Sequence, residues 1–136
     1  MKKILFVLCI VSILVSCLFT LVSCGDAPNE DPALAREALE SEGYTVVDGK
    51  ASASRFGIVG ITSSMHAYKE YESVTIFYFA DDESAEAAYD AIEKTIKNEK
   101  TEYAREGREY PDLGLETGVD GTVVWIGTPE AIAAAS

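Results

Sequence analysis

The stretch SVTIFYFA at residues 73–80 decides the fold of this 136-residue chain. Successive side chains of a β-strand point to opposite faces of its sheet, and here both alternating sets are largely apolar. The two sets are Val74, Ile76 and Tyr78, and Thr75, Phe77 and Phe79. The stretch therefore predicts a central strand, with a helical layer over at least one face of the sheet.

A long helix is expected directly after this strand, ending near Tyr103. Asp81-Asp82-Glu83 opens it, where the helix dipole favours negative charge. A buried stripe recurs at intervals of three, four and seven, namely Ala85, Ala88, Tyr89, Ile92, Ile96 and Tyr103. Two outward acid–lysine pairs are expected at i, i+4, namely Asp90–Lys94 and Glu93–Lys97.

The segment after this helix is polar and bears glycines. It predicts an exposed loop over 105–121, or a loop holding a weak strand near 115–119, because it is too long for a simple connection. A last strand follows at 122–126, and Thr128-Pro129-Glu130 caps a short alanine-rich helix.

The chain before the central strand predicts one helix and two strands. Asp31 caps the helix, Pro32 suits its first position and Gly43 supplies a left-handed stop. Its apolar stripe is Leu34, Ala35, Ala38 and Leu39. Strands are expected at 44–47, closed by Asp48-Gly49, and at 58–62, with a loop at 51–55.

These elements predict a single α+β domain over 31–136, in the order α-β-β-β-α-β-α. Its sheet is expected to be small and mixed or antiparallel, with helices packed on it. If the strands at 73–80 and 122–126 are parallel, the crossover through the long helix is right-handed.

The first residues of the chain have the composition of a signal peptide. Lys2 and Lys3 form a charged start, and residues 4–22 are almost wholly apolar. Leu21-Val22-Ser23-Cys24 resembles the lipobox of bacterial lipoproteins. The resemblance implies a diacylglycerol on the Cys24 sulfur, removal of the signal peptide 1–23, and a lipid-anchored tether at 24–30 on the extracytoplasmic face of a cell membrane.

Two alternatives to this assignment stay open. Leu14-Val15-Ser16-Cys17 repeats the same four letters, but cleavage there would leave the apolar residues 18–22 at the new terminus. An uncleaved segment 4–22 is about long enough to span a bilayer. The uncleaved span would also place the domain outside, because the two lysines on its cytoplasmic flank orient it the same way.

The part of the chain after residue 23 is strongly acidic. It holds all 23 acidic residues and all 11 basic residues except Lys2 and Lys3, so its net charge is −14. Binding to nucleic acid requires Lys and Arg to replace condensed counterions, so nucleic acid is not an expected partner. The acidity favours solubility near an anionic envelope over an acidic docking face for a basic partner.

No arrangement of residues predicts a catalytic or metal site. His66 lies near Ser63 and Ser64, but a hydrolase triad also needs a third orienting group and an oxyanion hole. The acids at 81–83 suit a helix start better than a cation site. Three acids spaced by four residues, Asp112, Glu116 and Asp120, do not resemble a calcium loop. One histidine and one remaining cysteine cannot build a zinc site, and we expect no metal or cofactor.

Arg105, Arg108 and Tyr110 form the only local group of basic and aromatic residues. They are candidates for binding a carboxylate or phosphate group. The alternative, which we favour, is that the arginines pair with Glu102, Glu106 and Glu109 as a solvated network.

The sequence therefore favours a lipid-anchored, non-enzymatic binding or envelope-accessory domain for an unidentified protein or small ligand. One alternative is a small envelope hydrolase or modifying enzyme that uses His66. The other is a module that self-associates through an unpaired strand edge. In size and layout the domain is similar to small α+β lipoproteins of unknown function.

Overall fold

Strand β3 (Glu72–Phe79) lies in the middle of a five-stranded sheet in the computed structural model, which describes residues 27–136. The strand order is β1-β2-β3-β5-β4, and every neighbouring pair is antiparallel. The predicted α+β class and central strand are confirmed, and the sheet is antiparallel. Because β3 and β5 are antiparallel, the rule for parallel crossovers does not apply to the helix between them.

The described residues form four helices and five strands. The other strands are β1 (Thr45–Asp48), β2 (Ile61–Lys69), β4 (Glu116–Asp120) and β5 (Val123–Gly127). The helices are α2 (Pro32–Ser41), α3 (Lys50–Phe56), α4 (Asp82–Arg105) and α5 (Pro129–Ala134). The order differs from the predicted one by an added helix, α3, and by β4, the weak strand expected within the long loop.

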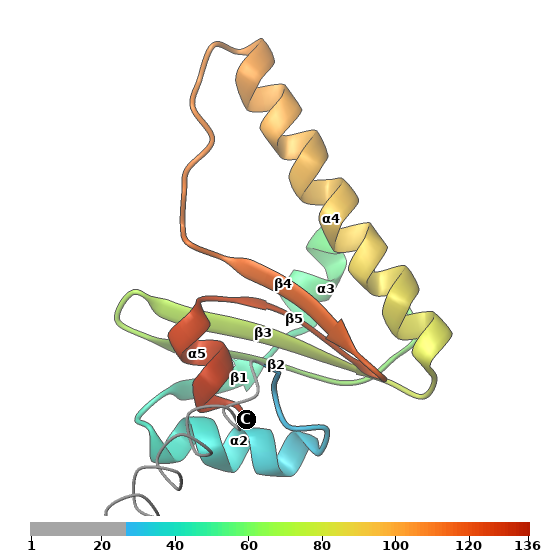
Figure 1. Ribbon diagram of the computed structural model, residues 1–136, viewed down its shortest axis with the longest axis vertical. Helices are drawn as coiled ribbons and strands as arrows, with labels where there is room; N and C mark the ends of the chain where they lie inside the picture. Colours follow the sequence, from blue (N-terminus) through green and yellow to red (C-terminus); the bar gives the residue numbers. More distant parts are fainter. Residues whose placement is uncertain (1–26) are drawn as a thin grey trace, which may run out of the picture.

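Helices cover both faces of the sheet (Figure 1). On one face α2 and α5 pack over Val74, Ile76 and Tyr78 of β3. On the other face α3 and α4 pack over Phe77 and Phe79 of the same strand. The two alternating sets of β3 thus belong to two separate apolar cores, and we name these cores the α2/α5 core and the α3/α4 core.

The predicted starts of α2 and α4 are confirmed by their capping contacts, whereas the Thr128 side chain at the start of α5 makes no capping hydrogen bond. The Asp31 carboxylate accepts a hydrogen bond from the Ala33 N–H at 2.9 Å, and Gly43 adopts the left-handed conformation (φ +87°) after α2. Asp81 caps α4 by accepting a hydrogen bond from the Ser84 N–H at 2.8 Å. The acidic residues 81–83 thus lie at the start of a helix, as predicted. The predicted stripe of α2 was wrong at Leu34, which is 50% exposed, whereas Ala35 and Leu39 are buried.

The predicted loop at 51–55 was wrong, because these residues belong to α3. The Asp48 carboxylate accepts a hydrogen bond from the Lys50 N–H at 2.8 Å, directly before the helix. Ala53 and Phe56, three positions apart, are buried in the α3/α4 core. Tertiary packing thus fixes a helix that is too short to show a periodic pattern.

The second strand begins later and runs further than the predicted 58–62. Strand β2 extends from Ile61 to Lys69 and pairs with β3 along its length, with a register shift between Ile61 and Ser63. Met65 and Ala67 enter the α2/α5 core, but the residues that alternate with them, Ser64, His66 and Tyr68, are polar or aromatic. This mixed alternation, together with Gly57 and Gly60, hides the strand in the sequence.

The first described residues are packed on the domain, although the sequence assigns them to a tether. Ala27 packs against the α2/α5 core and Pro28 is buried. The Asn29 N–H donates to the Ala135 carbonyl at 2.8 Å, and the Tyr78 hydroxyl donates to the Asn29 carbonyl at 2.9 Å. The signal peptide 1–23, Cys24 and the start of the tether lie outside the described residues.

Replacing Gly118 by alanine should destabilise the fold. Gly118 pairs with Trp125 across β4 and β5, and a Cβ at residue 118 would overlap the indole ring. We expect Gly118→Ala to lower the free energy of unfolding by about 1–3 kcal/mol, the usual effect of overpacking. Urea denaturation followed by circular dichroism measures the loss, and the emission of Trp125, the only tryptophan, reports the displaced ring.

The Trp125→Leu protein provides the control, because it lacks the ring that causes the overlap. In that background the decrease in the free energy of unfolding caused by Gly118→Ala should be less than about half as large. An equal cost in both backgrounds would contradict the assignment of the strain to this pair.

Candidate functional site

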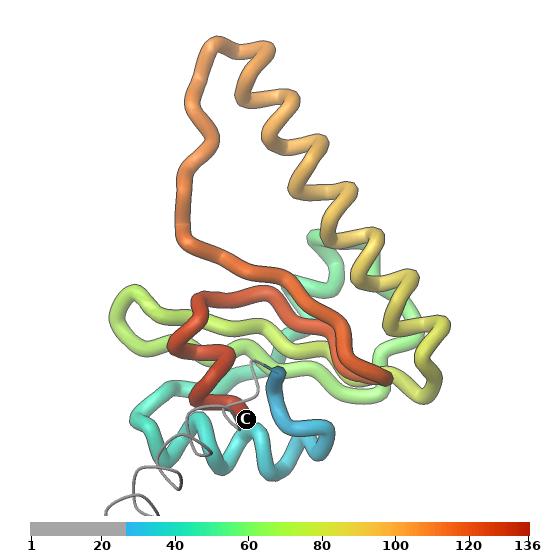
Figure 2. Tube along the Cα trace, in the orientation of Figure 1, coloured from blue at the N-terminus to red at the C-terminus, as the bar shows by residue number. Residues whose placement is uncertain are grey.

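Helix α4 is longer than the sheet that it covers. Its fully buried residues are Ala85, Ala88 and Ile92, all in the first half of its 24 residues. At 1.5 Å per residue the 13 residues from Glu93 to Arg105 extend about 20 Å further. The chain then returns to β4 as an extended segment beside the helix (Figures 1 and 2). We call residues 93–115 the arm.

One carboxylate, that of Glu99, joins the arm to the domain. It accepts from the Arg55 Nη2 of α3 with both oxygens, at 3.0 and 2.9 Å. Its Oε2 also accepts from the Tyr110 hydroxyl at 3.0 Å. Near the sheet, the Thr117 hydroxyl of β4 donates to the Glu93 carboxylate. The chain that returns from the tip of the arm is thus hydrogen-bonded to α4 at two positions, through Tyr110 and through Thr117.

The far end of the arm is held by the left-handed end of α4 and by two aromatic rings in contact. The Arg108 N–H donates to the Tyr103 carbonyl at 2.9 Å across Gly107, which has the left-handed φ of +68° that this stop requires. The rings of Tyr103 and Tyr110 meet edge to face with 5.2 Å between their centres. The Arg108 guanidinium lies 4.3 Å from the centre of the Tyr103 ring.

The three candidate ligand-binding residues all lie in this part of the arm. Arg105 contacts Glu102 at 2.8 Å and Arg108 contacts Glu106 at 2.6 Å, which is part of the expected network, but Glu109 forms no ion pair within the described residues. Tyr110 bonds to Glu99, and burial, followed by that carboxylate, raises the pKa of its hydroxyl. Arg108 and Tyr110 are brought together on the Tyr103 ring, whereas Arg105 contacts neither of them in the described part of the chain, and both arginines are engaged by glutamates.

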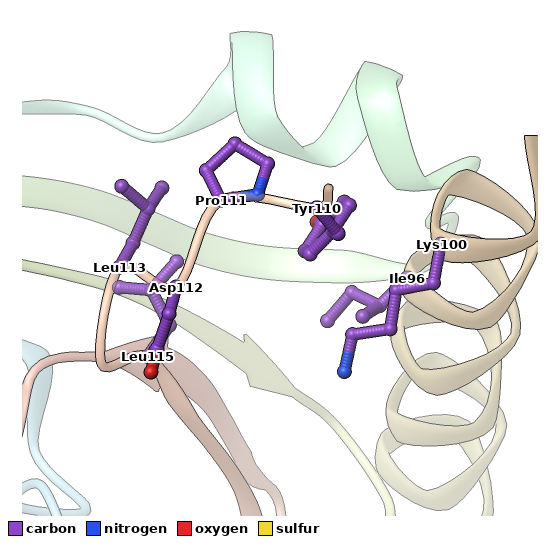
Figure 3. Close-up of a pocket in the computed structure, with 7 residues that line it drawn as sticks. All are labelled: Ile96, Lys100, Tyr110, Pro111, Asp112, Leu113 and Leu115. Carbon is purple, nitrogen blue, oxygen red and sulfur yellow. The ribbon is translucent and has the colours of Figure 1, made fainter. Parts of the chain in front are cut away.

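A groove lies between α4 and the returning segment (Figure 3). Its volume is about 360 Å³. Ile96 and Lys100 reach toward it from the helix, opposite residues of the segment 110–115 (Figure 3). A second hollow of about 500 Å³ continues along α4, and it shares Ile96 and Lys100 with the first. The remaining lining residues are Tyr110, Pro111, Asp112, Leu113 and Leu115 in the first, and Glu93, Lys94 and Lys97 in the second.

Lys94, Lys97 and Lys100 form a row along this helix wall. Among residues 27–136, none of them has a carboxylate within 4.0 Å, whereas the five arginine or lysine residues in ion pairs are Arg36, Lys50, Arg55, Arg105 and Arg108. The Lys69 ammonium donates to the Glu42 carbonyl at 2.8 Å. The expected ion pairs Asp90–Lys94 and Glu93–Lys97 are not formed among the described residues. Glu93 accepts a hydrogen bond from Thr117 instead.

His66 lies on β2, half-buried, with its Nδ1 at 2.8 Å from the Thr75 hydroxyl. Its ring stacks near that of Tyr68, with 5.9 Å between centres. Within the described residues no hydrogen bond or ion pair joins it to Ser63, Ser64 or an acid. Burial lowers the pKa of the imidazole, which favours its neutral form.

The loop acids do not come together. The Asp112 carboxylate accepts from the Gly114 N–H at 3.0 Å, and Glu116 and Asp120 lie at opposite ends of β4. In the described part of the chain no three acids, histidines or cysteines are grouped so that they could hold a metal ion. Across residues 27–136, no helix has the length and apolar composition needed to cross a membrane.

Comparison with known proteins found no matching family model, no matching curated protein and no matching solved structure. The groove is therefore defined by its geometry alone. Sequence reasoning missed it, because the groove depends on how far α4 extends beyond the sheet and on long-range bonds that occupy Glu93 and Glu99.

Replacing Glu99 by glutamine should loosen the arm without unfolding the domain. The change removes the ion pair to Arg55 and weakens the acceptor for Tyr110, which together are worth about 1 kcal/mol at this partly exposed position. We expect chymotrypsin to cleave after Leu113 about fivefold faster, because local opening becomes that much more frequent. The global free energy of unfolding should change by less than about 1 kcal/mol.

Glu102→Gln is the matched control, because its ion pair with Arg105 stays within one helix turn of the arm. This variant should be cleaved at the rate of the wild type. Equal acceleration in both variants would mean that Glu99 has no special part in holding the arm.

The imidazole of His66 should titrate below its ordinary value of about 6.5. Because the pKa in the folded state is lowered, the neutral ring stabilises the fold above about pH 6.5, and this contribution is lost as the pH falls through the folded pKa. The chain has one histidine, so its ring protons give a single NMR titration curve. A midpoint at or above that of the urea-unfolded chain would contradict the burial argument.

Proposed function

We propose that the protein is a lipid-anchored, extracytoplasmic binding domain that uses the arm to contact its partner. The lipobox-like sequence that ends at Cys24 supports the anchoring. The single observation that supports binding is the arm itself. It carries an open groove and a row of lysines that form no ion pair among the described residues, and apart from Ile96, which packs against the α3/α4 core, it lies beyond the two apolar cores that stabilise the fold.

The position of the first described residues supports this arrangement. Ala27 packs on the α2/α5 core, and three residues from Cys24 to Ala27 span at most about 11 Å. A lipid on Cys24 would therefore keep the α2/α5 side close to the membrane. The described chain starts beside α2 and α5, at the opposite end of the long axis from the tip of the arm (Figure 1). The arm would then point away from the bilayer.

The packing of the arm suits a binding role. The contacts of Glu99 with Arg55 and Tyr110 hold the two walls of the groove at a fixed separation. A preorganised surface loses less conformational entropy when a partner binds. The groove can thus present the same residues to each partner molecule.

Self-association is the second candidate. Strands β1 and β4 leave the two outer edges of the sheet unpaired, and an unpaired edge can join a second copy. The net charge of −14 on the part after residue 23 opposes such pairing at low ionic strength. Binding to a different partner is therefore the favoured function.

Intact mass of the protein from membranes of expressing cells tests the anchoring. We expect the mass of residues 24–136 plus acyl groups, and we expect Cys24→Ala to abolish both cleavage and acylation. Cys17→Ala is the matched control and should leave the mature mass unchanged, because it lies in the alternative box. An unmodified full-length mass for the unsubstituted chain would refute the lipoprotein assignment.

A further inference from the structure

We propose that the groove of the arm binds an extended, acidic and apolar peptide segment of a partner protein. The inference rests on the proposed binding function and names the class of partner. It follows from the charge of one wall, the apolar character of the other, and the open shape of the site.

The helix wall is the part of the domain that suits a carboxylate ligand. Lys94, Lys97 and Lys100 are exposed, and no acid of the described residues lies within 4.0 Å of them. The lining also holds two acids, Glu93, which accepts from Thr117, and Asp112, which accepts from the Gly114 N–H, so the three lysines outnumber the carboxylates there. In a domain of net negative charge, this row is where an anionic partner meets the least repulsion.

The facing wall supplies apolar contacts. Pro111, Leu113 and Leu115 line it, and Leu113 is 66% exposed. Ile96 contributes an apolar side chain from the helix between the lysines. Large exposed apolar side chains beside a charged row are typical of a surface that a partner covers.

The spacing of the lysines suits an extended peptide. Residues three apart on a helix rise by about 4.5 Å, so the row from Lys94 to Lys100 extends over about 9 Å. Alternate side chains of an extended peptide lie about 6.6 Å apart on one side, compared with about 4.5 Å between successive lysines along the helix. Flexible lysine side chains can accommodate this difference. Glutamates on one side would face the lysines, and apolar residues on the other would face Leu113 and Leu115.

The open shape favours a peptide over a fatty acid. An acyl chain needs an enclosed apolar cavity, because apolar ligands are held by burial of most of their surface. Here the wall residues Leu113 and Leu115 remain exposed, and a fatty acid offers one carboxylate to three lysines. A peptide can lie along the groove and meet several of these charges at once.

The test measures binding of a fluorescein-labelled, eight-residue peptide in which leucine and glutamate alternate. The protein is purified from membranes and placed in phosphatidylcholine nanodiscs, and fluorescence anisotropy gives the affinity. We expect Lys97→Gln/Lys100→Gln to weaken binding at least tenfold, and Leu113→Ser/Leu115→Ser to weaken it at least fivefold. The matched control, Arg36→Gln/Lys50→Gln, changes the net charge equally and should bind like the wild type.

Several results would overturn the proposal. These are the absence of peptide binding, equal binding by the groove and control variants, and equal binding of a peptide with glutamine in place of glutamate. Lysine-dependent binding to phosphatidylglycerol vesicles without peptide binding would identify a lipid surface instead. A dimer that dissociates in the Lys97→Gln/Lys100→Gln protein, again without peptide binding, would identify a second copy.

The same peptide measurement on Cys24→Ala separates this inference from the proposed anchoring. The variant should bind the peptide with unchanged affinity, because all residues that line the groove lie between Glu93 and Leu115. An unsubstituted protein that carries no lipid but binds the peptide would refute only the anchoring. A lipidated protein that does not bind the peptide would refute only the proposal that the groove binds a peptide.

Discussion

The whole structure depends on a strand that has no polar face. Val74 and Ile76 point into one core and Phe77 into the other, and the first two and Phe77 are completely buried. Such a strand is stable only when strands flank it on both edges and helices cover both faces. The antiparallel order β1-β2-β3-β5-β4 meets the first condition, and the helices on the two faces meet the second.

The arm results from a difference in length between α4 and the strands below it. Strands β4 and β5 have five residues each and span about 17 Å, whereas the 24 residues of α4 span about 36 Å. The sheet can therefore bury only the first half of the helix. The second half depends mainly on contacts with the returning segment, above all those of Glu99 and the edge-to-face rings of Tyr103 and Tyr110.

Local sequence predicted those elements whose pattern is long or well bounded. Strand β3, helix α4 and the caps Asp31 and Asp81 agree with the structure, because repeated apolar spacing and capping chemistry act over a few residues. Helix α3 was missed because it buries only Ala53 and Phe56. The lysine row was hidden because acids stand four residues before Lys94 and Lys97, and only the fold shows that Glu93 bonds to Thr117, 24 residues away.

The route of the chain out of the arm also determines which strand detaches first when the domain is pulled. The arm runs directly into β4, an edge strand that is hydrogen-bonded to β5 alone, while the chain enters the domain beside α2 and α5 (Figure 2). A pull between a partner held on the arm and the start of the chain acts across the strands and not along them. The hydrogen bonds between β4 and β5 then break one after another from one end. Strand β4 therefore detaches under tension while the two apolar cores around β3 stay intact.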